Sequence, residues 1–334
     1  MFFKELKFSK QIQEDQVRSV YQKNFNYILT ERYYFQQRWL HGAYNRFKDF
    51  DKYLILIHLV HKTFKAYGEF QLKYSFDEFY AKETYEIPRI NVIDLSRELL
   101  ISKETARRKI LEMERDGAIK KEKKKIMINR IGQEYQKPKI AIQSLSRLLS
   151  KFTIFLSESN YLDKKIDSSI LENKMRENFT QIWTYFFDFQ IPTIIGWKKF
   201  FGDIETWSIW AQCAYNQNLV INKRFKENIS KELTLDNLII KLNNEGTQGL
   251  NAMTISELSG IPRPTALRKL NNLAKRKLIK KDKNNLYLLF AQTTLDFHSI
   301  EKDKNLKIIS DTNKSNEARF IKLLTRILNN IVFN

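Results

Sequence analysis

The chain has 334 residues, with 58 Lys and Arg against 38 Asp and Glu, and its formal net charge is +20 at pH 7. A hydrophobic fraction of 43% argues against a disordered chain, and this length can supply two domains that each bury a core. The excess of positive charge favours a polyanionic partner, either nucleic acid or an anionic membrane surface.

Cysteine content and apolar runs indicate the compartment. The single cysteine, Cys213, excludes an intramolecular disulfide and fits a reducing compartment. The N-terminal stretch MFFKELKFSKQIQED lacks the continuous apolar core of a signal peptide. The longest apolar runs, such as YLILI, are too short to span a bilayer. We therefore expect a cytoplasmic protein with no membrane partner.

The N-terminal part of the chain reads as mainly helical. Residues 11–50 predict an aromatic-rich helix, and residues 52–64 predict the first helix of a small domain. Residues 70–74 alternate apolar and polar side chains, which predicts a short strand. A polar loop is expected to continue through Pro88, and the first small strand of the domain is expected near residues 90–92.

Two further helices are expected at residues 93–100 and 103–116. Ser102 can cap the second of them, because its hydroxyl oxygen can accept an unpaired N–H of the first turn. An apolar stripe at i, i+4 and i+7 consists of Ala106, Ile110 and Met113. The opposite face carries Lys103, Thr105, Arg107, Arg108 and Lys109. This helix is therefore amphipathic, with a basic outer face.

A β-hairpin is expected directly after this helix. Gly117 stands where the helix ends, in the left-handed conformation that glycine adopts at least cost. Residues 118–119 begin a strand, a lysine-rich turn follows, and Ile126 and Ile128 alternate as in a returning strand. Pro138 ends the hairpin region, and residues 140–156 predict a closing amphipathic helix.

The same segment occurs twice. Residues 251–288 align with residues 91–128 at a constant offset and without a gap. The matched identities include Asn91 and Asn251, Ser96 and Ser256, Ile101 and Ile261, Thr105 and Thr265, Ala106 and Ala266, Arg108 and Arg268, Lys109 and Lys269, Ile119 and Ile279, Lys120 and Lys280, and Lys121 and Lys281. Two segments in register indicate two copies of one unit.

Weaker matches extend the repeat over most of the chain, as between residues 207–210 and 53–56. The repeat predicts two domains, residues 1–157 and 168–334, with winged domains at about 51–130 and 205–290. The expected fold is mainly α with small β-wings: two tandem winged helix-turn-helix domains with flanking helices, related by a pseudo-twofold axis.

This arrangement resembles the MarR family of bacterial regulators. The resemblance implies that the flanking helices form a dimer interface and that the third helix of each domain reads half of a palindrome. The chain departs from the family in carrying both copies itself. Lys277 also stands opposite Gly117, and Leu267 stands opposite Arg107. The resemblance therefore implies a pseudo-dimer whose two reading helices differ and whose site is asymmetric.

The candidate DNA contacts lie on the two reading helices and the turns after them. Arginine can bond guanine O6 and N7 in the major groove, whereas wing lysines suit phosphates. The first helix supplies Ser102, Lys103, Thr105, Arg107 and Arg108, and the second supplies Arg263, Thr265, Arg268 and Lys269. The wings supply Lys121, Lys123, Lys124, Lys125, Lys281 and Lys283.

We expect a sequence-specific, double-stranded-DNA-binding transcriptional regulator that acts as a monomeric pseudo-dimer or as a homodimer. One alternative is a plasmid- or phage-type replication initiator, since the chain also resembles basic initiators with tandem winged domains that bind direct repeats. Another alternative is a winged-helix scaffold that binds no DNA.

We expect neither an enzyme nor a metal or cofactor. The sequence has no phosphate-cradling glycine loop and no nucleophile elbow. His58 and His61 share a helix face, but no Cys or carboxylate cluster completes a metal site. Cys213 fits a small core residue. The aromatic flanking helices are either the core that joins the halves or a pocket for a small-molecule effector.

Overall fold

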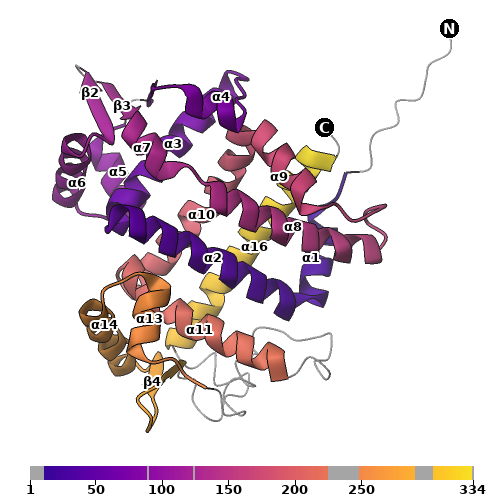
Figure 1. The fold of residues 1–334 in the computed structure, drawn as a ribbon, viewed down its shortest axis with the longest axis vertical. Helices are drawn as coiled ribbons and strands as arrows, with labels where there is room; N and C mark the ends of the chain where they lie inside the picture. The colour runs from indigo at the N-terminus through magenta and orange to yellow at the C-terminus, as the bar shows by residue number, and fades with distance from the viewer. Residues whose placement is uncertain (1–10, 89, 123–124, 225–247, 290–303, 333–334) are drawn as a thin grey trace.

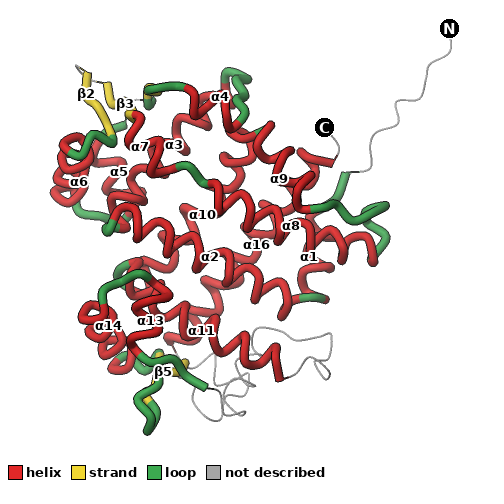
Figure 2. Tube along the Cα trace, viewed as in Figure 1, coloured by secondary structure: helices red, strands yellow, loops and turns green. Residues whose placement is uncertain are grey.

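The structure is a computed structural model that describes residues 11–88, 90–122, 125–224, 248–289 and 304–332. It is mainly helical, with short antiparallel strands at the rim of the helical body (Figures 1 and 2). None of the described helices has an apolar run long enough to cross a membrane.

The described elements divide into two series whose order is partly shared. The first series is α1 (Glu14–Lys23), α2 (Phe25–Phe47), α3 (Phe50–Glu69), α4 (Phe76–Ala81), β1 (Thr84–Glu86), α5 (Val92–Leu99), α6 (Lys103–Arg115), β2 (Ile119–Glu122), β3 (Lys125–Asn129), α7 (Arg130–Gln136) and α8 (Lys139–Glu158). The second series is α9 (Ser168–Glu177), α10 (Phe179–Phe201), α11 (Ile204–Arg224), α13 (Ala252–Ser259), α14 (Arg263–Lys275), β4 (Ile279–Lys281), β5 (Tyr287–Leu289) and α16 (Lys304–Val332).

Four pairs of corresponding helices agree in length, whereas α3 and α11 have 20 and 21 residues and α8 and α16 have 20 and 29. Helices α1 and α9 have 10 residues each, α2 and α10 have 23, α5 and α13 have 8, and α6 and α14 have 13. Helices α1, α2, α3, α5, α6 and α8 of the first series therefore have positional counterparts among the described helices of the second, whereas α4 and α7 have none there.

The strands form two small antiparallel sheets. The first has the order β1-β3-β2, and the second pairs β4 with β5, with an added bridge between Leu250 and Tyr287. The ungapped alignment slips by one residue in the returning strand. Lys121 pairs with Ile126. The ungapped alignment would pair Lys281 with Leu286, but Lys281 pairs with the next residue, Tyr287. The second turn is therefore one residue longer.

Helices α2 and α10 form the centre of the core. The Phe186 ring of α10 lies 5.7 Å from Phe35 and 4.8 Å from Trp39 of α2, between ring centroids. All three side chains are buried. Each aromatic pair therefore contributes about 0.5–1.5 kcal/mol of stabilising free energy beyond the hydrophobic gain from burying the rings. The aromatic flanking helices therefore do form the core that joins the two halves.

The two halves pack reciprocally. Helix α10 packs against α3, and its counterpart α2 packs against α11, the counterpart of α3. Likewise α1 packs against α16, and α9 packs against α8. Asn329 of α16 holds the chain just before α1, accepting from the Ile12 N–H and donating to the Ile12 carbonyl, both at 2.9 Å. Each half therefore completes the core of the other.

Several local predictions were wrong. The helix expected over residues 11–50 is interrupted at Asn24, which separates α1 from α2. The strand expected at residues 70–74 is absent from this described segment, because its alternation is not matched by burial: Phe70 is 75% exposed and Leu72 is 45% exposed. The expected polar loop contains α4, which the reciprocal Ser75 and Glu78 capping box starts.

The first strand also lies elsewhere than expected. It is β1 at Thr84–Glu86, not residues 90–92, because Tyr85 and Ile87 are the side chains that alternate into the core, each 4% exposed. Helix α7 then fills part of the segment between the hairpin and Pro138.

Candidate nucleic-acid interface

Helices α6 and α14 lie on the same side of the molecule. Figure 1 shows both along one edge, each with its β-hairpin beside it, and α1 along the opposite edge. Both helices follow a shorter helix, α5 or α13, after a tight turn. Two similar helices are therefore presented on one side of a shared hydrophobic core.

The two tight turns are built alike. Ser96 donates its hydroxyl to the Ile101 carbonyl at 2.6 Å, and Ser256 donates its hydroxyl to the Ile261 carbonyl at 2.7 Å. These serines were matched in the sequence, and the structure explains the match, since each closes the turn before the exposed helix.

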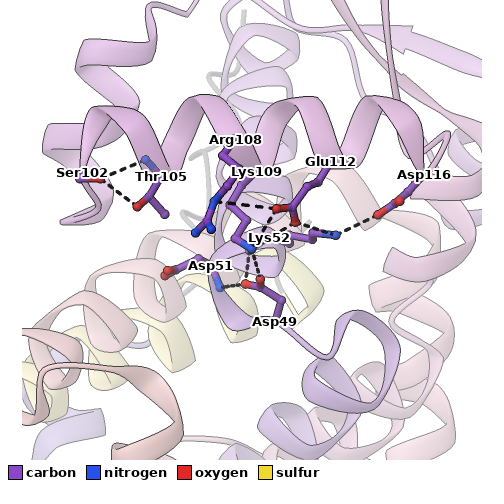
Figure 3. A network of polar contacts seen from close by, with 9 residues as sticks. All are labelled: Asp49, Asp51, Lys52, Ser102, Thr105, Arg108, Lys109, Glu112 and Asp116. Carbon is purple, nitrogen blue, oxygen red and sulfur yellow. Dashed lines mark hydrogen bonds and ion pairs between the residues drawn. The ribbon is translucent and has the colours of Figure 1, made fainter.

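The start of α6 uses two of the predicted contact residues. The Ser102 hydroxyl accepts from the Thr105 N–H at 3.0 Å and donates to the Thr105 hydroxyl at 2.8 Å (Figure 3). Ser102 therefore acts as the helix cap, as its sequence predicted, and Thr105 is half-buried. Lys103, Arg107 and Arg108 are exposed. The Arg108 side chain is 65% exposed and lies 3.9 Å from Glu112 of the same helix.

A charge network lies beneath α6. Lys109 contacts Asp49 at 2.6 Å and Glu112 at 3.1 Å, and Lys52 contacts Glu112 at 3.1 Å and Asp116 at 2.9 Å (Figure 3). Asp49 also caps α3, accepting from two N–H groups of its first turn. The network therefore fixes α6 to the start of α3, with Lys109 on the inner side.

The second half repeats the central contact of this network. Lys269, the counterpart of Lys109, contacts Asp203 at 2.5 Å, and its side chain is 12% exposed. Burial alone would raise the pKa of Asp203, but hydrogen bonds from Lys269 and Thr206 hold that pKa below its ordinary value. Lys269 was predicted to contact DNA; the structure engages it with Asp203, which holds α14 to α11, and its contact with DNA stays a prediction.

The outer face of α14 keeps the other predicted residues. Arg263 and Arg268 are exposed, and Thr265 is half-buried like Thr105. The sequence prediction missed a further matched pair, Arg115 and Lys275, which are both exposed. They stand seven residues after Arg108 and Arg268, on the same helix face, and this spacing together with their shared charge was the available signal.

The lysines of the first hairpin are paired with carboxylates. Lys120 contacts Glu122 at 2.6 Å, Lys121 contacts Glu114 at 2.9 Å, and Lys125 contacts Glu86 at 2.8 Å. Lys123 and Lys124 lie outside the described residues. In the second hairpin Lys280, Lys281 and Lys283 are exposed, and no carboxylate of the described residues is within ion-pair distance of them.

The exposed cations form two groups, one on each helix and its hairpin. The first basic surface consists of Lys103, Arg107, Arg108, Arg115, Lys120, Lys121 and Lys125. The second basic surface consists of Arg263, Arg268, Lys275, Lys280, Lys281 and Lys283. Both combine guanidinium groups on a helix with ammonium groups on a hairpin, which suits base edges and phosphates, respectively.

The histidines and the cysteine are engaged or buried. His58 contacts Glu98 at 3.1 Å, and His61 contacts Asp188 at 2.9 Å. Among the described residues, no group of three or more His, Cys, Asp or Glu side chains is arranged to hold a metal ion. Burial raises the pKa of Cys213 to about 12, so its thiol stays protonated and is no nucleophile at neutral pH.

A hollow of about 700 Å³ opens beside the end of α3, between α10 and α16. Its lining includes Phe64, Lys65, Tyr185, Asp188 and Arg326. The predicted small-molecule effector stays a prediction, since the hollow mixes both charges and does not by itself specify a ligand.

The arrangement is suited to binding a polyanion. Positive side chains are exposed on helices whose orientation is set by partly buried ion pairs and by hydrogen-bonded turns. Such an interface needs no bound cofactor. Comparison with protein-family models, with curated proteins and with solved structures finds no match to this chain, so its function is argued from this geometry.

Proposed function

We propose that this protein binds duplex DNA sequence-specifically and regulates transcription. In this proposal it is a single-chain pseudo-dimer of two winged helix-turn-helix units. The observation that carries the proposal is the repeated setting of Arg108 and Arg268. Each is exposed on a 13-residue helix, and the next residue, Lys109 or Lys269, anchors that helix to an aspartate beneath it.

The reciprocal packing of the halves supports the pseudo-dimer. When equivalent surfaces pack on each other around a common core, the two units are related by an approximate twofold axis. Two helices related in this way can enter successive major grooves on one face of a duplex, about 34–36 Å apart. The MarR-like interpretation has this geometry in a homodimer, and here one chain supplies both units.

The two helices would read different bases. Arg107 is exposed on α6, whereas the matched Leu267 of α14 is half-buried. A guanidinium group can bond guanine, but a leucine side chain offers only an apolar contact. The proposed DNA site is therefore asymmetric, with one more guanine contact in the half that α6 reads.

Selection from random-sequence duplexes followed by binding measurements tests this proposal. We expect an asymmetric two-part site. Arg108→Ala and Arg268→Ala should each weaken binding to that site by about 1–3 kcal/mol, roughly 5- to 150-fold, because each removes a bidentate contact. Binding of either variant to unrelated duplex should change by less than about threefold.

Lys322→Ala is the control, because it removes a positive charge from an exposed position of α16, outside both basic surfaces. It should leave specific binding unchanged. Equal losses by the arginine variants on selected and unrelated duplex would contradict base reading. Selection of arrayed direct repeats would favour a replication initiator. Failure of the intact protein to bind duplex at physiological salt would leave a scaffold as the better interpretation.

A further inference from the structure

The two matched segments differ in their excess of charge. Residues 91–128 contain 11 Lys and Arg against 7 Asp and Glu, a net charge of +4, whereas residues 251–288 contain 9 against 2, a net charge of +7. The second segment has fewer cations, so its higher charge comes from the loss of carboxylates. Glu104, Glu112, Glu114 and Asp116 of the first copy are matched by Pro264, Asn272, Ala274 and Arg276, respectively.

This difference changes the surroundings of matched lysines. Lys121 contacts Glu114 at 2.9 Å, but Ala274 stands at the matched position near Lys281. Lys120 contacts Glu122 at 2.6 Å, and that hydrogen bond holds the pKa of Glu122 below its ordinary value, so the carboxylate is ionised at neutral pH.

The acidic residue matched to Glu122 is used differently. The Asp282 carboxylate accepts from the Asn284 N–H at 2.9 Å and from the Leu286 N–H at 2.8 Å. It thereby closes the longer turn of the second hairpin, and no ion pair joins it to Lys280 or Lys281 within the described residues. Lys280 and Lys281 are both exposed, and the Lys281 ammonium lies 5.9 Å from the centre of the Tyr287 ring.

Phosphate binding responds to this local charge. A lysine that neutralises a phosphate releases a condensed counterion, and each such contact steepens the fall of log K with log salt concentration by about 0.9. A carboxylate about 3 Å from the ammonium group repels the same phosphate and competes for the lysine. Matched lysines can therefore contribute unequally to salt-dependent affinity.

We propose that the two basic surfaces divide the binding of DNA. The second basic surface is the clamp for the phosphate backbone and supplies most of the salt-dependent affinity. The first basic surface, whose hairpin lysines Lys120, Lys121 and Lys125 are each ion-paired with a carboxylate, contributes mainly through its exposed arginines to base recognition. This inference rests on the proposed function, because it concerns the same DNA interface.

Matched double variants test the division. Binding of the full chain to a mixed-sequence duplex is measured by fluorescence anisotropy from 50 to 300 mM KCl. Replacing Lys280 and Lys281 by Gln should lower the salt slope by about 1.8, which corresponds to two lost phosphate contacts. Replacing Lys120 and Lys121 by Gln removes the same charge at the matched positions, and it should lower the slope by less than about 0.9.

Removing carboxylates from the first copy should give its hairpin lysines the same salt-dependent phosphate binding. Glu114→Ala copies the matched Ala274, and Glu122→Gln removes the carboxylate that pairs with Lys120. The double variant should raise the salt slope by about 1–2, because it frees Lys121 and Lys120. Equal slope losses in the two lysine variants, or no gain in this third variant, would overturn the division. Absence of salt-dependent binding by the unaltered protein would instead overturn the proposed function, so the two failures are distinguishable.

Discussion

Asp49 and Asp203 show how single residues set the interface. Each caps the first turn of a long helix, α3 or α11, and also binds the lysine that follows the exposed arginine on α6 or α14. Adjacent cations on one helix therefore have opposite tasks. Arg108 and Arg268 are exposed on the outer face, where Arg108 also lies 3.9 Å from Glu112, whereas Lys109 and Lys269 fix the direction in which the helix points.

His58 should make folding stability depend on pH. Burial outweighs the nearby Glu98 carboxylate and lowers the pKa of His58 to about 4, below its ordinary value of 6.5. The unfolded chain then binds the proton first, so stability is fully present above pH 6.5 and is lost as the pH falls toward 4. We expect the thermal unfolding midpoint to decrease from pH 7 to pH 5.

His58→Gln is the matched test, since Gln212 stands at the corresponding position of α11. Glutamine does not titrate, so the variant should lose less stability over the same pH interval. Differential scanning calorimetry of both proteins measures the difference. The same decline in both proteins would show that other groups, not His58, cause the pH dependence.

At the scale of elements, the turns that flank α6 and α14 share a backbone conformation but not a residue type. The left-handed position before α6 is Leu100 at φ 51°, and the matched position before α14 is Gly260 at φ 73°. After the helices the pattern is reversed, with Gly117 at φ 74° and Lys277 at φ 56°. Lys277 replaces the expected glycine without changing the path of the chain.

Lys277→Gly should therefore stabilise the protein. A non-glycine residue in the left-handed region costs roughly 1–2 kcal/mol, and the added freedom of glycine in the unfolded chain returns about half of that. We expect the free energy of unfolding to rise by about 0.5–1 kcal/mol in urea denaturation.

Two further variants serve as controls for this prediction. Lys275→Gly, two residues earlier within α14, should lower stability by about 1 kcal/mol, because glycine is unfavourable inside a helix. Gly260→Ala should cost more than 1 kcal/mol, since its Cβ would lie 2.6 Å from the Asn45 side-chain oxygen and φ is positive there. A stability loss for Lys277→Gly would show that its side chain contributes more than its backbone strain costs.

At the scale of the molecule, reciprocal packing makes the two halves interdependent. The two corresponding helix contacts, α3 with α10 and α11 with α2, use different side chains. In the α3–α10 contact Asp188 binds His61 and Lys65 across the interface, whereas in the α11–α2 contact the rings of Tyr34 and Tyr215 lie 6.3 Å apart. Burial alone would raise the pKa of Asp188, but hydrogen bonds from His61, Arg326 and Lys65 lower it well below its ordinary value.

Separated halves, residues 1–157 and 168–334, should not form stable monomers, because α2 and α10 would each expose an aromatic face. Mixed together, they should form a one-to-one complex in preference to homodimers. A homodimer of the second half would place Asp188 against Tyr215 and would lose its contacts with His61 and Lys65. Analytical ultracentrifugation of each half and of the mixture measures this preference. Cooperative unfolding of either half as a monomer would contradict it.

The amino-acid sequence alone determined the local features of this protein. It predicted the helices at residues 93–100 and 103–116, found as Val92–Leu99 and Lys103–Arg115, because each carries an apolar stripe and a terminal turn and the second also carries its Ser102 cap. The repeat was visible for the same reason, since matched residues such as Ser96 and Ser256 act within a few positions of themselves. Local hydrogen bonds and helical periodicity depend on residues that are close together in the sequence.

Tertiary structure decided which of the predicted cations remain available. Lys269 and Arg268 are neighbours in sequence, but only Lys269 meets a carboxylate, and that carboxylate lies 66 positions earlier in the chain. The reciprocal packing of α2 and α10 and the true position of β1 likewise depend on partners far away in sequence. Burial and ion pairing depend on distances in space, which local residue patterns do not encode.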